Sequence, residues 1–360
     1  MKPTFHTLTI ADVKEETQDC CSIAFEVPVD LKQQYQFIQG QYLTLKTDIN
    51  GEEVRRSYSI CSSPNGDELR VAIKQVPNGK FSTYANQQLK KGDQLEVMTP
   101  TGKFYTALQA DHEKHYLGVA AGSGITPILS ILKTVLETEP NSRFTLLYGN
   151  KNTGSIIFKE QIEALKNVYM SRLTVHYFLS REMLDAPLMN GRIDRDKCQE
   201  IFTRLLDVSD LDECFSCGPE SMIFAVRDSL LAQGFDQGKI HFELFTSPLG
   251  KLGQERQRQT KEEDKGKVTD VTIKLDGKAF QFDLPFDSDN LLDAALKQGA
   301  DLPFACKGGV CCTCRARLIE GSVEMAVNYA LEADEVEAGF ILTCQSFPTT
   351  EKVVVDFDDV

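Results

Sequence analysis

The chain has 360 residues, of which 41% are hydrophobic, and its formal net charge is −14. This length predicts two or three domains with ample core, and the acidic balance argues against nucleic acid as a partner. Residues 1–6 lack the pattern of a signal peptide, and no apolar run approaches the roughly 18 residues of a membrane span. The eleven cysteines form no repeated framework like that of small secreted proteins, so we expect a cytoplasmic location and no membrane association.

Residues 1–107 contain short alternating runs separated by glycine turns, for example 42–46, 57–61 and 69–74. This pattern predicts a small antiparallel β-barrel. The same region holds Arg56-Ser57-Tyr58-Ser59, which offers the countercharge, π surface and hydroxyl that a flavin requires. An amphipathic strand with a surface arginine would explain the same four residues.

A second flavin candidate is the segment Gly79-Lys80-Phe81-Ser82, which precedes a helix predicted over residues 83–89. Backbone N–H groups and a hydroxyl at the start of a helix can face a pyrophosphate. A turn with a serine N-cap is the alternative interpretation. Lys74, at the end of its predicted strand, is a further candidate on the flavin side.

Residues 108–246 alternate between strands and helices, which indicates an α/β lobe. A strand over 116–121 runs into a glycine loop and then a helix through residue 136, the order that nucleotide phosphates require. The loop lacks the third glycine of the generic dinucleotide fingerprint. Its candidate binding residues are Gly122, Ser123, Gly124, Ile125, Thr126 and Pro127.

Three later strands are predicted, the first ending at residue 150, the second over 175–179 and the third over 214–219. Cys214 and Cys217 have the spacing of a redox dithiol, but side chains three apart on a strand face opposite ways, so we expect no disulfide. Cys217 either shapes a hydride-transfer pocket or is a small buried residue. Phe245, just before the polar stretch that follows this lobe, is the aromatic residue that we place near the flavin.

Residues 247–267 are polar and are predicted to form a linker. Two strands over 268–284 follow, joined by a hairpin turn, then a helix over 290–298 and a closing strand over 352–357. Residues 268–360 contain 17 Asp and Glu but only 7 Lys and Arg. This acidic surface either steers the domain to a basic patch on an electron acceptor or keeps the protein soluble.

Four cysteines in this last region, Cys306, Cys311, Cys314 and Cys344, have the spacing of a plant-type [2Fe–2S] ferredoxin. The glycines between the first two let the backbone wrap a cluster and direct N–H groups at its sulfurs. A structural zinc site is the alternative, but zinc sites usually pair two short knuckles, and this region has one. Cys312 fits neither ligand spacing and is predicted to be a small buried residue.

These motifs resemble those of the ferredoxin–NADP reductase superfamily. Residues 56–59 resemble its Arg-x-Tyr-Ser flavin signature, residues 122–127 its Gly-x-Gly-x-x-Pro nicotinamide loop, and Cys217-Gly218-Pro219 the Cys-Gly-Pro segment beside its nicotinamide. The resemblance implies a multidomain α/β plus β fold. Its parts are an antiparallel flavin-binding β-barrel (1–107), a doubly wound NAD(P)-binding lobe (108–246), the linker (247–267) and a C-terminal β-grasp ferredoxin domain (268–360).

The resemblance also implies residue roles and cofactors. Tyr58 would pack on the flavin, the Ser59 hydroxyl would approach its reactive edge, and Arg56 would hold phosphate. FAD is favoured, although related reductases with this domain order use FMN. Ser180-Arg181 follows the strand that family members use to bind the adenosine 2′-phosphate, which favours NADPH over NADH, whereas the neighbouring Glu182 weakens that preference.

Residues 55–61, 300–311 and 353–357 narrow the resemblance to reductase components of the di-iron oxygenases that epoxidise phenylacetyl-CoA in bacterial phenylacetate degradation. NADPH would then give a hydride to the flavin, which passes single electrons to the cluster and so to a separate oxygenase. The sequence has no evident di-iron or acyl-CoA motif, so the chain should not itself insert oxygen. The alternatives are another aromatic or alkyl oxygenase as partner, and a redox-sensing iron–sulfur module without turnover.

Overall fold

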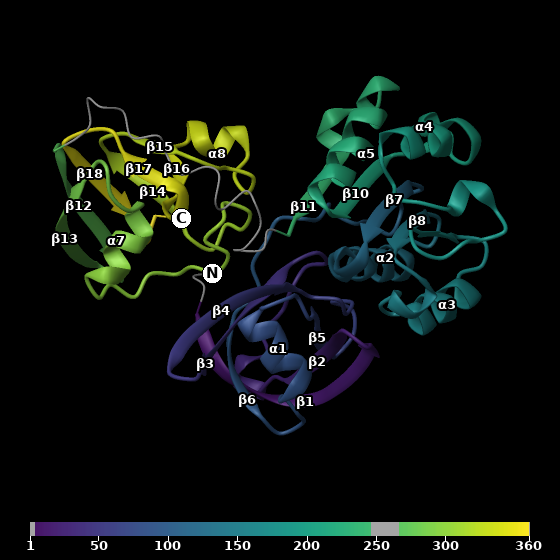
Figure 1. The fold of residues 1–360 in the computed structure, drawn as a ribbon, viewed down its shortest axis with the longest axis horizontal. Helices are drawn as coiled ribbons and strands as arrows, with labels where there is room; N and C mark the ends of the chain where they lie inside the picture. The colour runs from purple at the N-terminus through teal and green to yellow at the C-terminus, as the bar shows by residue number, and fades with distance from the viewer. Residues whose placement is uncertain (1–3, 246–265, 360) are drawn as a thin grey trace. The chain divides into compact units, whose positions relative to one another are not determined.

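A computed structural model describes residues 4–245 and 266–359. The chain divides into two compact units, Met1–Phe245 and Thr246–Val360 (Figure 1). Most of the predicted linker, residues 247–267, lies outside the described residues. Among the helices of the described residues, none combines the length and apolar character needed to cross a membrane.

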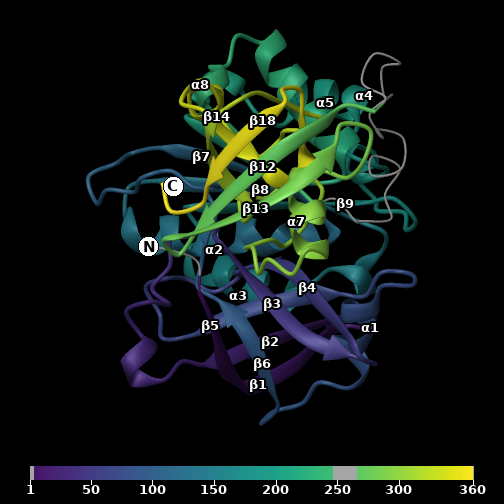
Figure 2. The same cartoon turned by 90° about the vertical axis from the view of Figure 1, so that its left-hand side faces the viewer.

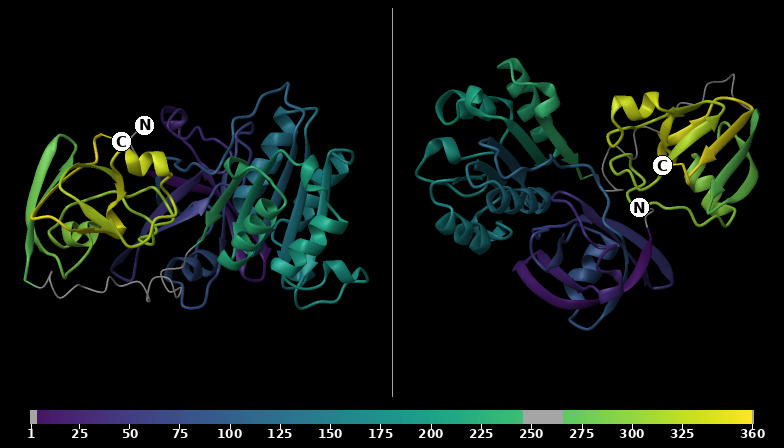
Figure 3. Two further views of the ribbon diagram at one scale, coloured as in Figure 1. Left: turned by 90° about the horizontal axis from the view of Figure 1, so that it is seen from above. Right: turned by 180° about the vertical axis from the view of Figure 1, so that it is seen from behind.

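The first unit begins with an antiparallel sheet in the order β4-β3-β6-β1-β2-β5, and Figure 3 shows that this sheet is curled. Its strands are β1 (Phe5–Thr17), β2 (Cys20–Glu26), β3 (Tyr42–Ile49), β4 (Glu52–Ser59), β5 (Leu69–Lys74) and β6 (Gln94–Met98). Alternate apolar side chains such as Leu8, Leu43 and Val97 fill the interior. The two edge strands meet where Ile60, directly after β4, bridges Val71 of β5. The predicted barrel is therefore confirmed as a curled sheet closed at one narrow seam.

Helix α1 (Lys80–Gln87) packs on the barrel core through Phe81 and Ala85. The prediction that this helix spans 83–89 was wrong at its start, because Gly79 is the N-cap. The Ser82 hydroxyl instead accepts a hydrogen bond from the N–H of Val76 at 3.2 Å, which joins the first turn of the helix to the turn before it. The first turn of the helix therefore includes the segment that sequence analysis assigned to the flavin.

The second half of this unit is a parallel sheet in the order β11-β10-β7-β8-β9. Its strands are β7 (His115–Ala121), β8 (Arg143–Asn150), β9 (Leu173–Leu179), β10 (Glu213–Gly218) and β11 (Ile240–Leu244), and its helices are α2 (Ile125–Thr138), α3 (Lys159–Val168), α4 (Arg195–Arg204) and α5 (Glu220–Ala232). Right-handed crossovers place α2 and α3 on one face and α4 and α5 on the other (Figure 1). This confirms the doubly wound lobe, whose strand order reverses between β7 and β10.

Helix α2 joins the barrel to the lobe. Its Ser130 hydroxyl donates to the carbonyl of Ser62 at 2.7 Å, and its Lys133 ammonium donates to the carbonyl of Cys61 at 3.1 Å. Both acceptors lie just after β4, the strand that carries the predicted flavin signature. Since α2 begins at the predicted nicotinamide loop, these hydrogen bonds hold the two candidate binding elements in one rigid framework.

The second unit is a mixed sheet in the order β13-β12-β18-β14-β16, in which β12 and β18 are parallel (Figure 2). Its elements are β12 (Val268–Leu275), β13 (Lys278–Pro285), α7 (Leu291–Lys297), β14 (Arg315–Glu320), β15 (Val323–Met325), α8 (Ala333–Glu337), β16 (Phe340–Leu342), β17 (Ser346–Pro348) and β18 (Lys352–Asp356). Leu292 and Ala295 of α7 share a core with Val271 and Val355 of the sheet. The predicted hairpin, helix and closing strand are all present, which confirms the β-grasp arrangement.

Candidate functional site

A cavity of about 640 Å³ lies at the carboxyl ends of β7 and β10, where the strand order of the lobe reverses. This is the position at which doubly wound sheets bind nucleotides. The predicted residues that line it are Lys74, Gly122, Ser123, Gly124, Ser180, Arg181, Gly218, Pro219 and Phe245. Parallel strand order thus brings together segments that are far apart in the sequence.

Gly124 sits in the 3-10 turn η2 (Gly122–Gly124), between β7 and α2. A Cβ atom at this position would lie 2.0 Å from the carbonyl oxygen of Cys217, so only glycine allows the turn to pack against β10. This close packing places the glycine turn at the wall of the cavity, where its backbone can approach a phosphate closely.

The remaining residues of the predicted nicotinamide loop do not line this cavity. Ile125, Thr126 and Pro127 form the first turn of α2 and are buried. The Thr126 hydroxyl donates to the carbonyl of Ser123 at 3.0 Å. These three residues therefore help to fix the shape of the glycine turn and do not face the cavity.

Two cations in the cavity wall, Lys151 and Arg192, were missed by sequence analysis. With Arg181 they suit a ligand that carries several phosphate groups. Lys151 directly follows β8, so its place after a parallel strand was a usable signal. Arg192 lies in an irregular segment after the turn η4 (Pro187–Met189), and nothing local in the sequence indicated it.

The two candidate catalytic residues, Ser59 and Cys217, both neighbour Glu243, a residue that sequence analysis missed. The buried Ser59 hydroxyl donates to Glu243 Oε2 at 3.1 Å, and Glu243 pairs in register with Cys217 across β10 and β11. Burial raises the pKa of Glu243 to about 7, against the opposing effect of the Ser59 hydrogen bond. Burial, with Glu243 nearby, also raises the pKa of Cys217. Cys217 is therefore a neutral thiol at pH 7, not a nucleophile.

Most of the other residues that sequence analysis assigned to the flavin lie on the barrel and on α1. Arg56 and Tyr58 are half-buried on β4, and the Tyr58 ring centroid lies 5.6 Å from that of Phe81. Because Phe81 is buried in the barrel core, only its backbone is available to a ligand. The N-cap Gly79 supplies no capping side chain, which leaves the first-turn N–H groups of α1 suited to a pyrophosphate.

Three further predicted residues lie around these two sites. Lys80 forms an ion pair with Glu52 at the start of α1. The Lys74 ammonium lies 3.6 Å from an Asp19 carboxylate oxygen and also lines the cavity of the lobe, so it stands between the barrel and the nucleotide loop. The Phe245 side chain is 43% exposed at the same cavity, so its ring is accessible to a ligand there.

In the second unit the four predicted cluster cysteines converge. Cys306 Sγ and Cys311 Sγ are 3.1 Å apart, and Cys344 contacts both Cys306 and Cys314. Hydrogen bonds from the Cys311 and Cys344 thiols and from backbone N–H groups, including that of Gly308 at 3.3 Å, hold the pKa of Cys306 well below its usual value. A thiolate with N–H donors directed at its sulfur is what an iron–sulfur cluster requires.

The backbone of the cysteine loop is tightly packed. A Cβ atom on Gly309 would lie 2.8 Å from the carbonyl oxygen of Val327, so glycine is needed for the loop to close. The prediction that Cys312 is buried was wrong, because Cys312 is only half-buried, between two buried neighbours, Cys311 and Thr313. Within the described part of the chain, no group of three or more His, Cys, Asp or Glu side chains is arranged to hold a single metal ion.

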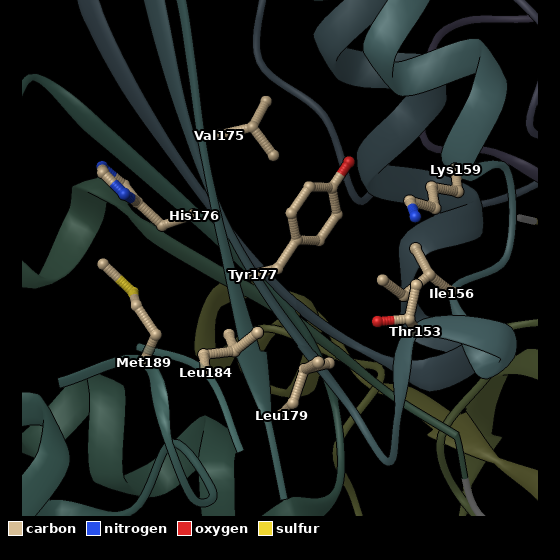
Figure 4. A pocket seen from close by; sticks show the side chains of 9 residues that line it. All are labelled: Thr153, Ile156, Lys159, Val175, His176, Tyr177, Leu179, Leu184 and Met189. Carbon is tan, nitrogen blue, oxygen red and sulfur yellow. The ribbon is translucent and has the colours of Figure 1, made fainter. Parts of the chain in front are cut away.

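A second cavity of the lobe, of about 280 Å³, lies against β9 and is lined mainly by apolar side chains. Thr153, Ile156 and Lys159 lie on one side of it, and Leu184 and Met189 on another (Figure 4). It contains no residue that sequence analysis singled out. The segments on either side of this cavity also supply residues to the larger cavity.

Comparisons with known proteins agree with this architecture. Three family models match, an oxidoreductase FAD-binding domain over residues 7–105, an oxidoreductase NAD-binding domain over 119–228, and a 2Fe-2S iron-sulfur cluster binding domain over 273–349. A component of the 1,2-phenylacetyl-CoA epoxidase of Escherichia coli K12 is 45% identical over 99% of this chain and 98% of its own length. The ferredoxin reductase component of 3-ketosteroid-9-alpha-monooxygenase from Rhodococcus rhodochrous is 34% identical over 97% of this chain and 96% of its own.

The chain belongs to the oxygenase reductases of the ferredoxin–NADP reductase superfamily. Among solved structures, phthalate dioxygenase reductase shares the fold with a TM-score of 0.57 and 23% identity, over 98% of both chains. A self-sufficient cytochrome P450 monooxygenase contains it with a TM-score of 0.69 and 21% identity, over 98% of this chain and 41% of its own.

As an oxygenase reductase, the chain is an NAD(P)H-dependent flavin and iron–sulfur oxidoreductase with FAD, a [2Fe–2S] cluster and a nicotinamide cofactor. The match to the 2Fe-2S family supports a [2Fe–2S] cluster and not the alternative structural zinc site. All eleven cysteines, each within the described residues, are free of disulfides, as we predicted for Cys214 and Cys217. The residues described above fit these groups, with four convergent thiols in one unit, and a glycine turn and an uncapped helix start in the other.

The raised pKa of Glu243 in this reductase makes its stability depend on pH. The pKa is about 7 when folded and near the ordinary 4.5 when unfolded, so the stability that protonation contributes is present below about 4.5 and is lost as the pH rises to about 7. This loss is on the order of 3 kcal/mol. Glu243→Gln stays neutral, so we expect it to raise the melting temperature of the holoprotein relative to wild type at pH 8 more than at pH 5. An equal difference at both pH values would contradict the prediction.

Proposed function

We propose that the chain carries electrons from NADPH to the oxygenase component of a phenylacetyl-CoA epoxidase. The single observation behind this choice is the 45% identity to the E. coli epoxidase component, which extends over nearly the full length of both chains. The 3-ketosteroid and glycine betaine monooxygenase reductases named by the other comparisons are at most 34% identical. Reduction of another oxygenase of this kind is therefore the second candidate.

The cofactors supply a two-electron acceptor for hydride and a one-electron carrier for the partner, and the chain's own residues position them. We assign Arg56, Lys80 and the first-turn N–H groups of α1 to the phosphates of FAD, and Tyr58 to its ring. We place Ser59 and Cys217 beside the hydride-transfer position. Their contact with Glu243 supports this assignment, because it fixes a strand of the barrel against a strand of the lobe.

The nicotinamide dinucleotide is assigned to the larger cavity. Its pyrophosphate would bind the turn at Gly122–Gly124, and its nicotinamide would lie toward Gly218, Pro219 and Phe245. Ser180 and Arg181, with the neighbouring Lys151 and Arg192, would bind a 2′-phosphate at the other end. This cluster of cations favours NADPH over NADH.

We also propose that the flavin-binding barrel ends at residue 107, that the NAD(P)-binding lobe begins at residue 108, and that the linker separates this lobe from the ferredoxin domain. We further propose that the protein is cytoplasmic.

The assignment of the 2′-phosphate predicts a selective effect of one arginine. We expect Arg181→Ala to lower kcat/KM for NADPH by roughly 10- to 100-fold, because a hydrogen bond to a charged group contributes about 1.5–3 kcal/mol. The value for NADH should change little, since NADH lacks that phosphate. Steady-state kinetics with both nucleotides would check this, and an equal loss for both would contradict the assignment.

An anaerobic titration of the holoprotein with NADPH, in which the flavin and cluster absorbance bands are followed together, would test electron transfer within the chain. We expect both bands to bleach. A coupled assay would then compare the purified oxygenase components of phenylacetyl-CoA epoxidase and 3-ketosteroid monooxygenase as acceptors. Turnover with the second alone would overturn the choice of partner, and no bleaching would overturn the reductase function itself.

A further inference from the structure

We propose that Glu182 is a positioning residue that makes the outer end of the larger cavity selective for a 2′-phosphate, through hydrogen bonds between its carboxylate and Thr153. This inference rests on the proposed function, because it concerns how the chain distinguishes NADPH from NADH. From the sequence alone, an acidic residue beside Arg181 weakens the expected preference for NADPH. The inference gives Glu182 the opposite effect.

The Glu182 carboxylate is held by two hydrogen bonds from one residue. Oε2 accepts from the backbone N–H of Thr153 at 2.7 Å, and Oε1 accepts from the Thr153 hydroxyl at 2.7 Å. The backbone hydrogen bond, followed by that of the hydroxyl, lowers the pKa of Glu182. The group is therefore an anion whose two oxygens are both turned toward Thr153.

The backbones on either side of this contact are also paired. The N–H of Ser180 donates to the carbonyl of Asn150 at 3.0 Å, and that of Arg181 donates to the carbonyl of Lys151 at 2.8 Å. The segment after β9 is thus joined to the segment after β8 at three successive points, with Glu182 as the last. These two segments carry Lys151 and Arg181, two of the three cations assigned to the 2′-phosphate.

The contact separates the anion from the cations. Lys151, Ser180 and Arg181 line the larger cavity, whereas Glu182 does not. Thr153 lies on the wall of the smaller cavity (Figure 4) and begins the turn η3 (Thr153–Ser155), whose last residue again faces the larger one. The two hydrogen bonds therefore keep a negative charge away from the position of a phosphate and hold the cationic segments in place.

The test uses Thr153→Val, which keeps the shape of the side chain but removes the hydroxyl donor and releases one carboxylate oxygen. A neutral hydrogen bond of this kind contributes about 0.5–1.5 kcal/mol, so we expect kcat/KM for NADPH to fall about 3- to 10-fold, mainly through KM. The value for NADH should stay within about 2-fold. In the double variant T153V/E182Q the released group is uncharged, so we expect the NADPH/NADH ratio to return to within about 2-fold of wild type.

Ser209→Ala is the matched control. The Asp207 carboxylate also accepts from one backbone N–H and one hydroxyl, both of Ser209, at 2.9 and 2.7 Å, and neither residue lines the larger cavity. We expect S209A to leave the NADPH/NADH ratio unchanged. A ratio that stays within about 2-fold in T153V, or that falls further in the double variant, would overturn the inference.

The wild-type kinetics separate this inference from the proposed function. A wild-type protein that reduces its flavin with NADH better than with NADPH would overturn the role of Glu182 and leave the reductase function in place. A protein that oxidises neither nucleotide would overturn the proposed function itself. Binding of adenosine 2′,5′-bisphosphate by the holoprotein gives a readout independent of turnover, and we expect it to weaken in T153V by the same factor as the KM change.

Discussion

Replacing Cys311 with serine is expected to abolish electron transfer to a one-electron protein acceptor while flavin reduction by NADPH continues at close to the wild-type rate. Cys311 is one of four thiols that converge in the second unit, 3.1 Å from Cys306, and a plant-type cluster requires all four. Hydride transfer is assigned to residues of the other unit. The measurements are stopped-flow flavin reduction by NADPH and steady-state reduction of cytochrome c.

Cys312→Ser provides the control for this prediction. Cys312 is the neighbouring thiol in the same loop, is half-buried and does not have the spacing of a ligand, so its replacement should leave both activities unchanged. The iron content of each variant would confirm that only Cys311→Ser affects the cluster. An equal loss of flavin reduction and acceptor reduction in Cys311→Ser would contradict the division of labour between the two units.

Gly124→Ala is expected to lower kcat/KM for NADPH by about 100-fold while the flavin and the cluster remain bound. The new Cβ would lie 2.0 Å from the carbonyl oxygen of Cys217, so the turn at Gly122–Gly124 must move away from β10 by an ångström or more. A displacement of this size in a positioning element costs about two orders of magnitude in rate. NADPH and NADH should be affected alike, because the turn is assigned to the pyrophosphate that both share.

Gly66→Ala serves as the control, because a Cβ at Gly66 would meet only the carbonyl oxygen of Ser63, at an ordinary 3.7 Å. Absorbance spectra would report flavin and cluster content, and thermal unfolding would report stability. Gly124→Ala with wild-type kinetics would exclude the turn as a binding element. Loss of bound flavin in this variant would instead point to a general failure of packing between the barrel and the lobe.

The sequence alone was sufficient for features that depend on local spacing. Four cysteines at ligand spacing, a glycine turn between a strand and a helix, and alternating strands between turns each follow from residues close together in the chain. The cluster and the type of each part of the fold, including the doubly wound lobe and the β-grasp domain, were predicted from such patterns and from the family they resemble. The glycine turn and three of the four cysteines each lie within one turn or loop, and the family resemblance supplied the fourth cysteine and the order of the strands.

Other features depend on contacts between distant segments, and only the tertiary structure decided them. Ser59 and Glu243 are 184 positions apart, and their contact arises only when β11 packs beside the barrel. Lys151 joins the cations of the cavity because β8 and β9 are neighbours in the sheet. The direction of Glu182, toward Thr153 and away from the cavity, depends on the same pairing. A sequence pattern records which side chains are available, but strand order and packing determine which of them face one another.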